Sequence, residues 1–314
     1  PLTGQPFPQT SPGLYQIPSN RINANALTFL NAFAPLPNIP SNGFLNYINL
    51  NPEINNTRDD EIKVDHNFGS RLRLMAEYLD DDQDNENPSN PYISSPFNVS
   101  RGAVTTSNSL AQVQLTATIT PSMVNTTSVN MDAYIPSLLA RGLWLQSQLP
   151  DFHQTLPFHG FLSDRLPQVN FAGGWSSIGQ ATVIPSPNPA NLVNTLSDDW
   201  SWVRGKHFLQ AGMALQYGTS RQNTFSASNG QWFFSGQFTG NPIADYLLGD
   251  AASFSQASNV LRVYNHWKTV TPYVEDRWKV TRRLTLTGGL RYLFMTLPNI
   301  QKQFATNFVA SLYN

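Results

Sequence analysis

The acidic run Asp80–Glu86 is a dense group of oxygen ligands and the first place to look for chemistry. Carboxylates at every second position could hold a hard cation such as Ca²⁺, namely Asp80, Asp82 and Asp84. The run fails as an EF-hand loop, because Asn85 stands where that loop needs glycine and Pro91 where it needs the closing glutamate. A solvated acidic loop is the better interpretation, and a metal site is the weaker one.

Other candidate groups do not form a catalytic arrangement. The five histidines show no metal-ligand spacing: His66, His153, His159, His207 and His266. Gly173–Ser176 lacks the second glycine of a G-x-S-x-G nucleophile elbow, and the sequence contains no glycine-rich phosphate loop. Asp198–Asp199 and Glu275–Asp276 are adjacent on expected strands, so their side chains point to opposite faces and cannot act as one acid–base pair. The sequence therefore predicts a protein that is not an enzyme and needs no cofactor.

Aromatic side chains in the long stretch 135–198 suggest a binding site, because glycine, serine and asparagine surround them. The ligand-binding candidates are Trp144, Phe152, Phe158, Phe161 and Trp175. Aromatic rings beside amides suit sugars or peptides. The competing interpretation, which we favour slightly, is that these rings pack the loop onto itself.

The elements that would position these groups follow from the spacing of turns. Long Asn-, Ser- and Pro-rich connections lie roughly at 80–108, 135–198, 218–229 and from 295 onward. Four short polar turns each join two runs of alternating hydrophobicity, at Gly69–Ser70, Thr120–Ser122, Arg204–Lys206 and Thr281–Arg283. Short turns at one end and long loops at the other are typical of a transmembrane β-barrel of the bacterial outer membrane. A soluble sandwich would scatter its loop lengths over both ends.

Alternation within the expected strands supports the same fold class. In Glu61–Phe68, Ile62 and Val64 share one face, and Lys63 and Asp65 share the other. A barrel would turn the apolar set to lipid and the charged set to a watery lumen, whereas a soluble sheet would turn the apolar set to a core, so alternation alone does not decide. Aromatic residues add evidence, because two girdles are expected at the two membrane interfaces. They fall near the long-loop ends at Tyr78, Tyr134, Tyr217 and Tyr292, and near the short-turn ends at Phe68, Trp202, Phe208 and Trp278.

Following the strand directions gives an all-β, antiparallel barrel segment of about ten strands with long extracellular loops. Short helices are expected at Ala24–Phe33 and Pro242–Leu248. If every short turn lies on one side, strands at Gln231–Gly236 and Trp267–Val280 would both run toward it, so an extra strand is needed at Ser253–Tyr264. This path places the helix 242–248 on the short-turn side. We divide the chain into an extracellular loop region at 1–60, barrel strands with long loops at 61–294, and the start of a further extracellular loop or strand at 295–314.

Composition narrows the partners. The 314 residues carry a net charge of −1, which gives no basic surface for nucleic acid. Only 12% of residues are charged, against ~25% in an average globular domain, and this suits a protein with one face in lipid. Cysteine is absent, which excludes disulfides and thiolate metal sites. The chain begins Pro-Leu-Thr-Gly without a signal peptide, and we interpret it as a processed chain or a fragment, of which we favour the fragment.

Several motifs in order along the chain resemble one family, the Oar-like TonB-dependent receptors of Gram-negative outer membranes. The similar segments are Gln16–Ile22, Arg58–Phe68, Trp202–Gly212, Phe234–Gly249 and Tyr273–Tyr292. They include Arg204-Gly205-Lys206-His207, Thr239-Gly240-Asn241-Pro242 and Gly289-Leu290-Arg291-Tyr292. The resemblance implies a barrel of about 22 strands, an N-terminal carboxypeptidase-regulatory-like domain, a TonB box and a plug domain. The last three are not visible in this sequence, which resembles a middle portion of the barrel.

The resemblance implies energised transport. The intact protein would take up or present a bulky solute, for example an oligosaccharide, a peptide or a siderophore-like compound, with energy relayed by a TonB-type complex through the plug. Its other partner would be outer-membrane lipid. Two alternatives from other classes remain open: a structural or adhesive surface protein, and a soluble secreted carbohydrate-binding β-domain.

Overall fold

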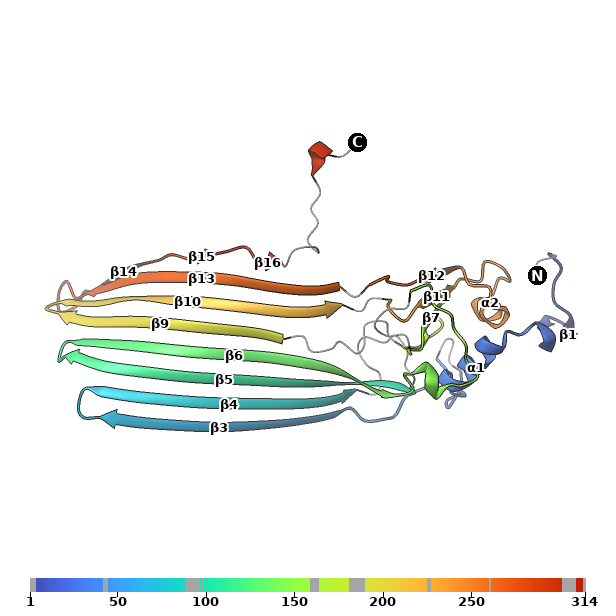
Figure 1. The fold of residues 1–314 in the computed structure, drawn as a ribbon, viewed down its shortest axis with the longest axis horizontal. Coiled ribbons are helices and arrows are strands. Elements are labelled where there is room, and N and C mark those ends of the chain that lie inside the picture. Colours follow the sequence, from blue (N-terminus) through green and yellow to red (C-terminus); the bar gives the residue numbers. More distant parts are fainter. Residues whose placement is uncertain are drawn as a thin grey trace.

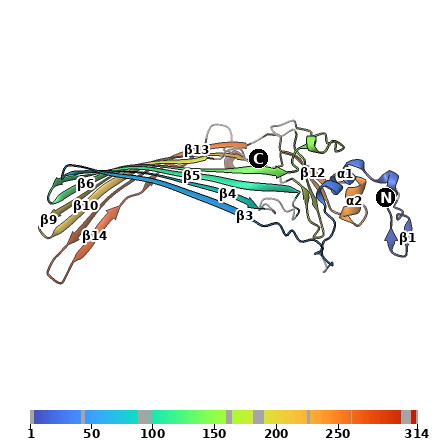
Figure 2. The same cartoon turned by 90° about the horizontal axis from the view of Figure 1, so that it is seen from below.

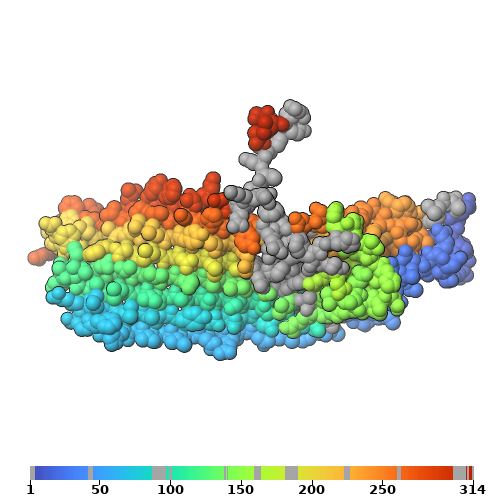
Figure 3. Space-filling model, viewed as in Figure 1, coloured from blue at the N-terminus to red at the C-terminus, as the bar shows by residue number. Residues whose placement is uncertain are grey.

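The protein consists of a long antiparallel sheet, which we call the wall, and a smaller lobe at one end of it (Figures 1 and 3). The computed structural model describes residues 4–41, 45–87, 97, 99–158, 164–180, 190–224, 227–259, 261–300 and 309–312. Small elements outside these two parts are β1 (Gln9–Ser11), β2 (Leu14–Tyr15), η1 (Ser19–Arg21) and η3 (Ala310–Leu312).

The wall is a ten-stranded sheet. Across it the order is β14 (Leu286–Arg291), β13 (Leu261–Trp278), β10 (His207–Thr224), β9 (Ala190–Arg204), β6 (Met123–Gly142), β5 (Ser100–Thr120), β4 (Leu72–Asn87) and β3 (Ile54–Phe68). Two further strands, β15 (Phe294–Met295) and β16 (Asn299–Ile300), pair with β13 beyond β14. Within the described chain, β3 pairs only with β4 and β14 only with β13, so the curved sheet has two open edges (Figure 2).

The short turns lie together at the end of the wall away from the lobe, as the sequence predicts (Figure 1). Glycine is required at two of them, because Gly69 and Gly205 have φ angles of +71° and +61°. Side chains other than glycine rarely adopt this left-handed conformation. The turns therefore fix the registers of the β3–β4 and β9–β10 hairpins.

Apolar side chains line up on one face of the wall because the strands alternate in phase. The register sets them opposite one another in successive pairs: Ile62–Tyr78, Val113–Val129, Leu196–Leu215 and Val274–Leu290. On the other face Lys63 lies opposite Glu77, and their side chains form an ion pair of 3.1 Å. Ile62 and Leu290 are 67% and 73% exposed, so the apolar face lies open in the described structure.

The lobe is built around a four-stranded sheet of order β12 (Ser253–Ser255), β11 (Gln231–Phe234), β7 (Gln168–Phe171) and β8 (Ile178–Gly179). Two helices pack beside it, α1 (Ala24–Phe33) and α2 (Pro242–Leu248), and both match the predicted spans. A 3-10 turn, η2 (Gln146–Gln148), lies in the long connection from β6. The buried core draws on both helices, on β7, β8 and β11 and on the connection after β6, and contains Ala26, Phe29, Phe33, Phe152, Leu166, Val169, Ile178, Phe234 and Tyr246.

Each helix begins at an asparagine that caps it. The Asn23 side chain accepts a hydrogen bond from the Ala26 amide, and the Asn241 side chain accepts bonds from the amides of Ile243 and Ala244. These bonds satisfy amide groups that have no partner inside the helix. Helix α2 ends at Gly249, whose φ of +81° is the left-handed conformation that glycine provides.

The wall strands extend further than the sequence predicts. The acidic run Asp80–Glu86, expected to be a loop, belongs to β4 and pairs with both β3 and β5. The expected loops at 80–108, 135–198 and 218–229 shrink accordingly, since β5 begins at Ser100, β6 ends at Gly142, β9 begins at Ala190 and β10 ends at Thr224. The expected loop region 1–60 likewise ends early, because β3 begins at Ile54. The prediction was wrong because it relied on the polarity of the side chains. Backbone hydrogen bonds to a strand on each side keep these polar residues in strands.

The predicted chain path between β10 and β13 is wrong. Gln231–Phe234 and Ser253–Ser255 pair with each other in the lobe. The expected strand Ser253–Tyr264 therefore does not cross the wall as a separate strand, and its last residues, from Leu261, begin β13. The helix α2 consequently lies at the lobe end, not at the short-turn end (Figure 1). The physical reason is that the chain stays at the lobe end after β10 and returns along β13, which removes the need for an extra crossing.

Candidate functional site

The acidic residues Asp80, Asp82 and Asp84 follow one another along β4. Alternate residues of a strand lie about 7 Å apart, so these carboxylates do not converge on one point. At the Glu86 end of the run, arginines bind the acids: Arg101 of the adjacent strand β5 and Arg141 of β6, one strand further, lie 2.8 and 2.9 Å from Glu86, and Arg141 lies 3.7 Å from Asp84. Among the residues that the structure describes, no three His, Asp or Glu side chains are grouped so as to hold a metal ion.

The predicted ligand-binding aromatics separate into two groups. Trp144 and Phe152 are 2% and 7% exposed and pack inside the lobe. Phe158 and Trp175 lie on its surface, 43% and 53% exposed. Phe161 lies outside the described residues. Only Phe152 lines the cavity of the lobe, so the structure does not bring the predicted set together.

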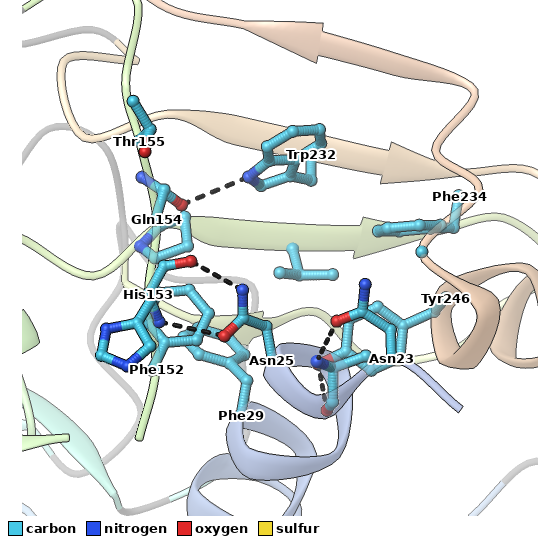
Figure 4. Close-up of a pocket in the computed structure, with 14 residues that line it drawn as sticks. Asn23, Asn25, Phe29, Phe152, His153, Gln154, Thr155, Trp232, Phe234 and Tyr246 are labelled. Carbon is cyan, nitrogen blue, oxygen red and sulfur yellow. Dashed lines mark hydrogen bonds between the residues drawn. The ribbon is translucent and has the colours of Figure 1, made fainter. Parts of the chain in front are cut away.

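The lobe contains a cavity of about 280 Å³ between α1, the 152–155 segment and β11 (Figure 4). Its floor is apolar and buried, and contains Phe29, Phe152, Val169, Phe234 and Tyr246. Its exposed rim is polar and contains Asn23, His153 and Thr155. Trp232, Asn25 and Gln154 are partly buried between the two. The sequence prediction missed the residues from α1 and β11, because they are remote in sequence from the 135–198 stretch.

Hydrogen bonds hold the cavity wall in place. Asn25 clamps the backbone of His153: its Nδ2 donates to the carbonyl oxygen at 2.6 Å, and its Oδ1 accepts from the amide at 3.0 Å. Gln154 accepts a bond from the Trp232 indole and donates one to the Asn229 carbonyl, both 3.3 Å long. The Trp232 ring is also braced by Phe254, with ring centroids 4.4 Å apart.

The cavity floor carries no charged side chain, and the one histidine of the lining, His153, lies on the exposed rim. No Asp, Glu, Lys or Arg side chain lines the cavity. Burial raises the pKa of the Tyr246 hydroxyl well above its ordinary value, so this group stays protonated and donates a 2.8 Å hydrogen bond to the Ala26 carbonyl. Elsewhere in the lobe, burial lowers the pKa of Arg165, and the nearby Asp164 opposes that effect.

The apolar face of the wall is a second functional surface. On β10 it runs from Leu209 to Tyr217, which at ~3.4 Å per residue is about 27 Å along the strand. Tyr78 and Tyr217 lie on this face toward the lobe, and Phe68, Trp202 and Trp278 lie on it near the short turns. Tyr134 and Phe208, which the sequence assigns to the same girdles, lie on the opposite face beside Asn108 and Arg277. An open apolar band of this size with aromatic borders matches the ~25 Å hydrocarbon region that barrels cross.

No helix in the described part of the chain is long and apolar enough to span a membrane.

Comparison with known proteins gives one match. A family model described as "Outer membrane beta barrel domain" matches residues 1–314, which is the whole chain. The chain matches none of the curated proteins and none of the solved structures with which it was compared.

Proposed function

Since the chain belongs to the outer membrane β-barrel domain family and is a protein of the bacterial outer membrane, we propose that it forms part of a TonB-dependent receptor that takes up a bulky solute. The wall would cross the membrane with its apolar face in lipid, and the lobe would face the outside. The proposal includes no catalytic step.

The observation that carries the proposal is the folded lobe at the long-loop end. Long extracellular loops are common to outer-membrane barrels, but they do not generally need to share one core. Here three segments that are separate in sequence contribute to one core and one cavity: the N-terminal segment with α1, the described residues between β6 and β9, and the segment between β10 and β13. A rigid platform with a cavity outside the membrane is what surface recognition of a solute requires. The motif resemblance to Oar-like receptors supports energised uptake.

The open edges of the wall bear on how the receptor is completed. The β3 edge and the β14 edge expose backbone groups that lipid does not hydrogen-bond. We propose that further strands pair with both edges and close a wider ring around a plug domain.

Uptake by cells of the native host tests the proposal. Wild-type cells and cells lacking the gene would receive a defined mixture of neutral oligosaccharides, short peptides and iron chelates, with and without a protonophore. We expect at least one solute to be depleted from the medium by the wild type only, and the protonophore to stop that depletion, because TonB draws on the inner-membrane proton gradient.

Two other outcomes would contradict uptake. Equal depletion by both strains would remove the transport role. Protonophore-insensitive surface retention would favour the adhesive role, for which the exposed rings of Phe158 and Trp175 give the lobe a contact surface. Detergent-dependent extraction of the protein from the outer membrane in the same cultures is the control for its presence.

A further inference from the structure

We propose that the lobe cavity binds one neutral sugar ring of a glycan, through Trp232 and the rim groups of Thr155 and Asn23. This inference deepens the proposed receptor function and rests on it for its biological role. The binding chemistry itself follows from the cavity lining.

The lack of charge on the cavity floor selects an uncharged ligand. A phosphate, carboxylate or ammonium group placed on the buried floor would lose water and find no Asp, Glu, Lys or Arg in the lining, and the one histidine, His153, lies on the exposed rim. This excludes acidic sugars, phosphorylated compounds and the termini of peptides as the group bound inside.

The aromatic lining suits the C–H face of a pyranose ring. Phe29, Phe152 and Phe234 form a buried floor, and Trp232 lies across the cavity from Phe29 (Figure 4). The bracing contact with Phe254 and the bond to Gln154 fix the indole in one orientation. A preordered aromatic ring binds an apolar face without the entropy cost of ordering it.

Hydroxyl groups of the ligand would find free partners at the rim. The Thr155 hydroxyl makes no hydrogen bond within the described structure, and the Asn23 side chain uses only its oxygen, which caps α1. A hydroxyl can donate and accept, and an amide nitrogen donates twice. A sugar ring has an apolar C–H face and hydroxyl groups around its edge. The apolar floor would contact that face, and the rim groups would hydrogen-bond the hydroxyls.

The size of the cavity limits what enters. About 280 Å³ lies at the lower end of ligand pockets, so a single ring fits and a longer glycan does not. Thr155, His153 and Asn23 are exposed at the rim, so the remainder of a glycan would extend into solvent.

Calorimetric titration of the detergent-solubilised native protein tests the site. The probes are maltohexaose, cellohexaose and mannohexaose, with oligogalacturonate as the acidic control. We expect one neutral hexamer to bind and oligogalacturonate not to bind. Thr155→Val should raise Kd about fivefold by removing a ligand hydrogen bond, and Trp232→Ala should raise it at least tenfold by removing the aromatic face.

The matched control is Trp175→Ala, which removes an exposed tryptophan of the same lobe outside the cavity lining and should leave Kd within twofold of wild type. Thr155→Val keeps the test valid if Trp232→Ala does not fold, because Thr155 is exposed and packs in no core.

Three results would overturn the sugar site: no neutral hexamer binds, both cavity variants bind as wild type does, or the peptide Ala-Phe-Ala displaces the bound hexamer. The outcome is separable from that of the uptake experiment. If the protein binds a sugar but cells show no protonophore-sensitive depletion, the sugar site stands and the transport role is removed. If cells show energised depletion but the protein binds no hexamer, the transport role stands and the sugar site is removed.

Discussion

The wall and the lobe differ in where their apolar side chains lie. The wall has one layer, and residues such as Ile62 and Leu290 stay exposed on its apolar face, whereas the lobe buries Phe29 and Phe33 to 1% exposure. The wall therefore depends on its surroundings for the hydrophobic contribution to stability, and the lobe carries its own core. The effect of a substitution on stability should therefore depend on its region: in the wall on the contact of the side chain with the bilayer, and in the lobe on its packing in a core that excludes water.

The largest expected effect is in the lobe core. Phe29 packs against Phe33 and Phe152 with ring centroids 4.5 and 5.0 Å apart. Phe29→Ala should destabilise the lobe by ~3–5 kcal/mol, because it leaves a cavity among aromatic rings. Hydrogen exchange followed by mass spectrometry should show faster exchange in α1, β7 and β11 and unchanged exchange in β4–β6.

Leu36→Ala is the matched control, because Leu36 is 86% exposed and its truncation should change no exchange rate. Faster exchange throughout the wall in Phe29→Ala would contradict the independence of the two regions.

A charge on the apolar face of the wall should give the next largest effect. Val113 lies between Ala76 and Val129 on that face. Val113→Arg should destabilise the protein by ~2–4 kcal/mol in lipid vesicles, as charges on the lipid face of barrels do near the midplane. The measurement is urea titration of the folded fraction, read from heat-modifiable migration on gels.

The control for this charge is the adjacent residue. Gln112 lies on the opposite face beside Glu77 and Asn130, so Gln112→Arg should cost much less. Equal costs for the two substitutions would show that the assignment of the faces is wrong.

The wall was largely predictable from sequence, whereas in the lobe the two helices were predictable and their packing was not. Strand alternation and glycine turns are local signals, and the turns at Gly69 and Gly205 fix the registers of two hairpins. The lobe depends on contacts between remote residues, such as Asn25 with His153, 128 positions apart, and Tyr246 with Ala26, 220 positions apart. No local period reports such contacts.

The two prominent errors of prediction have the same origin. The polarity of Asp80–Glu86 indicated a loop, but β5 and β6 supply arginines that pair with Asp84 and Glu86. The candidate aromatics came from one stretch of sequence, whereas the cavity combines Phe152 with Phe29 and Trp232 from two others. In both cases the deciding partner lies far away along the chain.

A smaller effect in the lobe depends on pH. Burial raises the pKa of Tyr246 above its ordinary value of ~10, so the folded lobe keeps a proton that the unfolded chain releases in alkali. This stability is fully present below pH ~10 and is lost as the pH rises above it. Tyr246→Phe should cost ~1 kcal/mol at neutral pH, through the lost bond to Ala26, and should weaken the alkaline fall in stability.

Hydrogen exchange of α2 at a series of alkaline pH values, corrected for intrinsic rates, measures this dependence. Tyr15→Phe is the control, because Tyr15 is 56% exposed and outside the lobe core, and it should keep the full alkaline fall. A Tyr246→Phe variant with an unchanged alkaline fall would contradict the role of this hydroxyl.

The smallest effect should arise where the wall meets the lobe. Arg141 at the end of β6 binds Glu86 and Asp84 of β4, and its side chain is 39% exposed. Water and salt screen such a pair, so Arg141→Gln should cost roughly 0.5–1 kcal/mol at low ionic strength and less at 1 M salt.

Arg58→Gln is the control, because its pair with Asp60 is 77% and 54% exposed and should contribute nothing measurable. Urea titrations at two salt concentrations separate these cases. A loss of stability that is independent of salt and as large as that of Val113→Arg would contradict this assignment. It would mean that contacts other than ion pairs stabilise the acidic end of β4, and that this end, from Asp80 onward, belongs to the lobe and not to the wall.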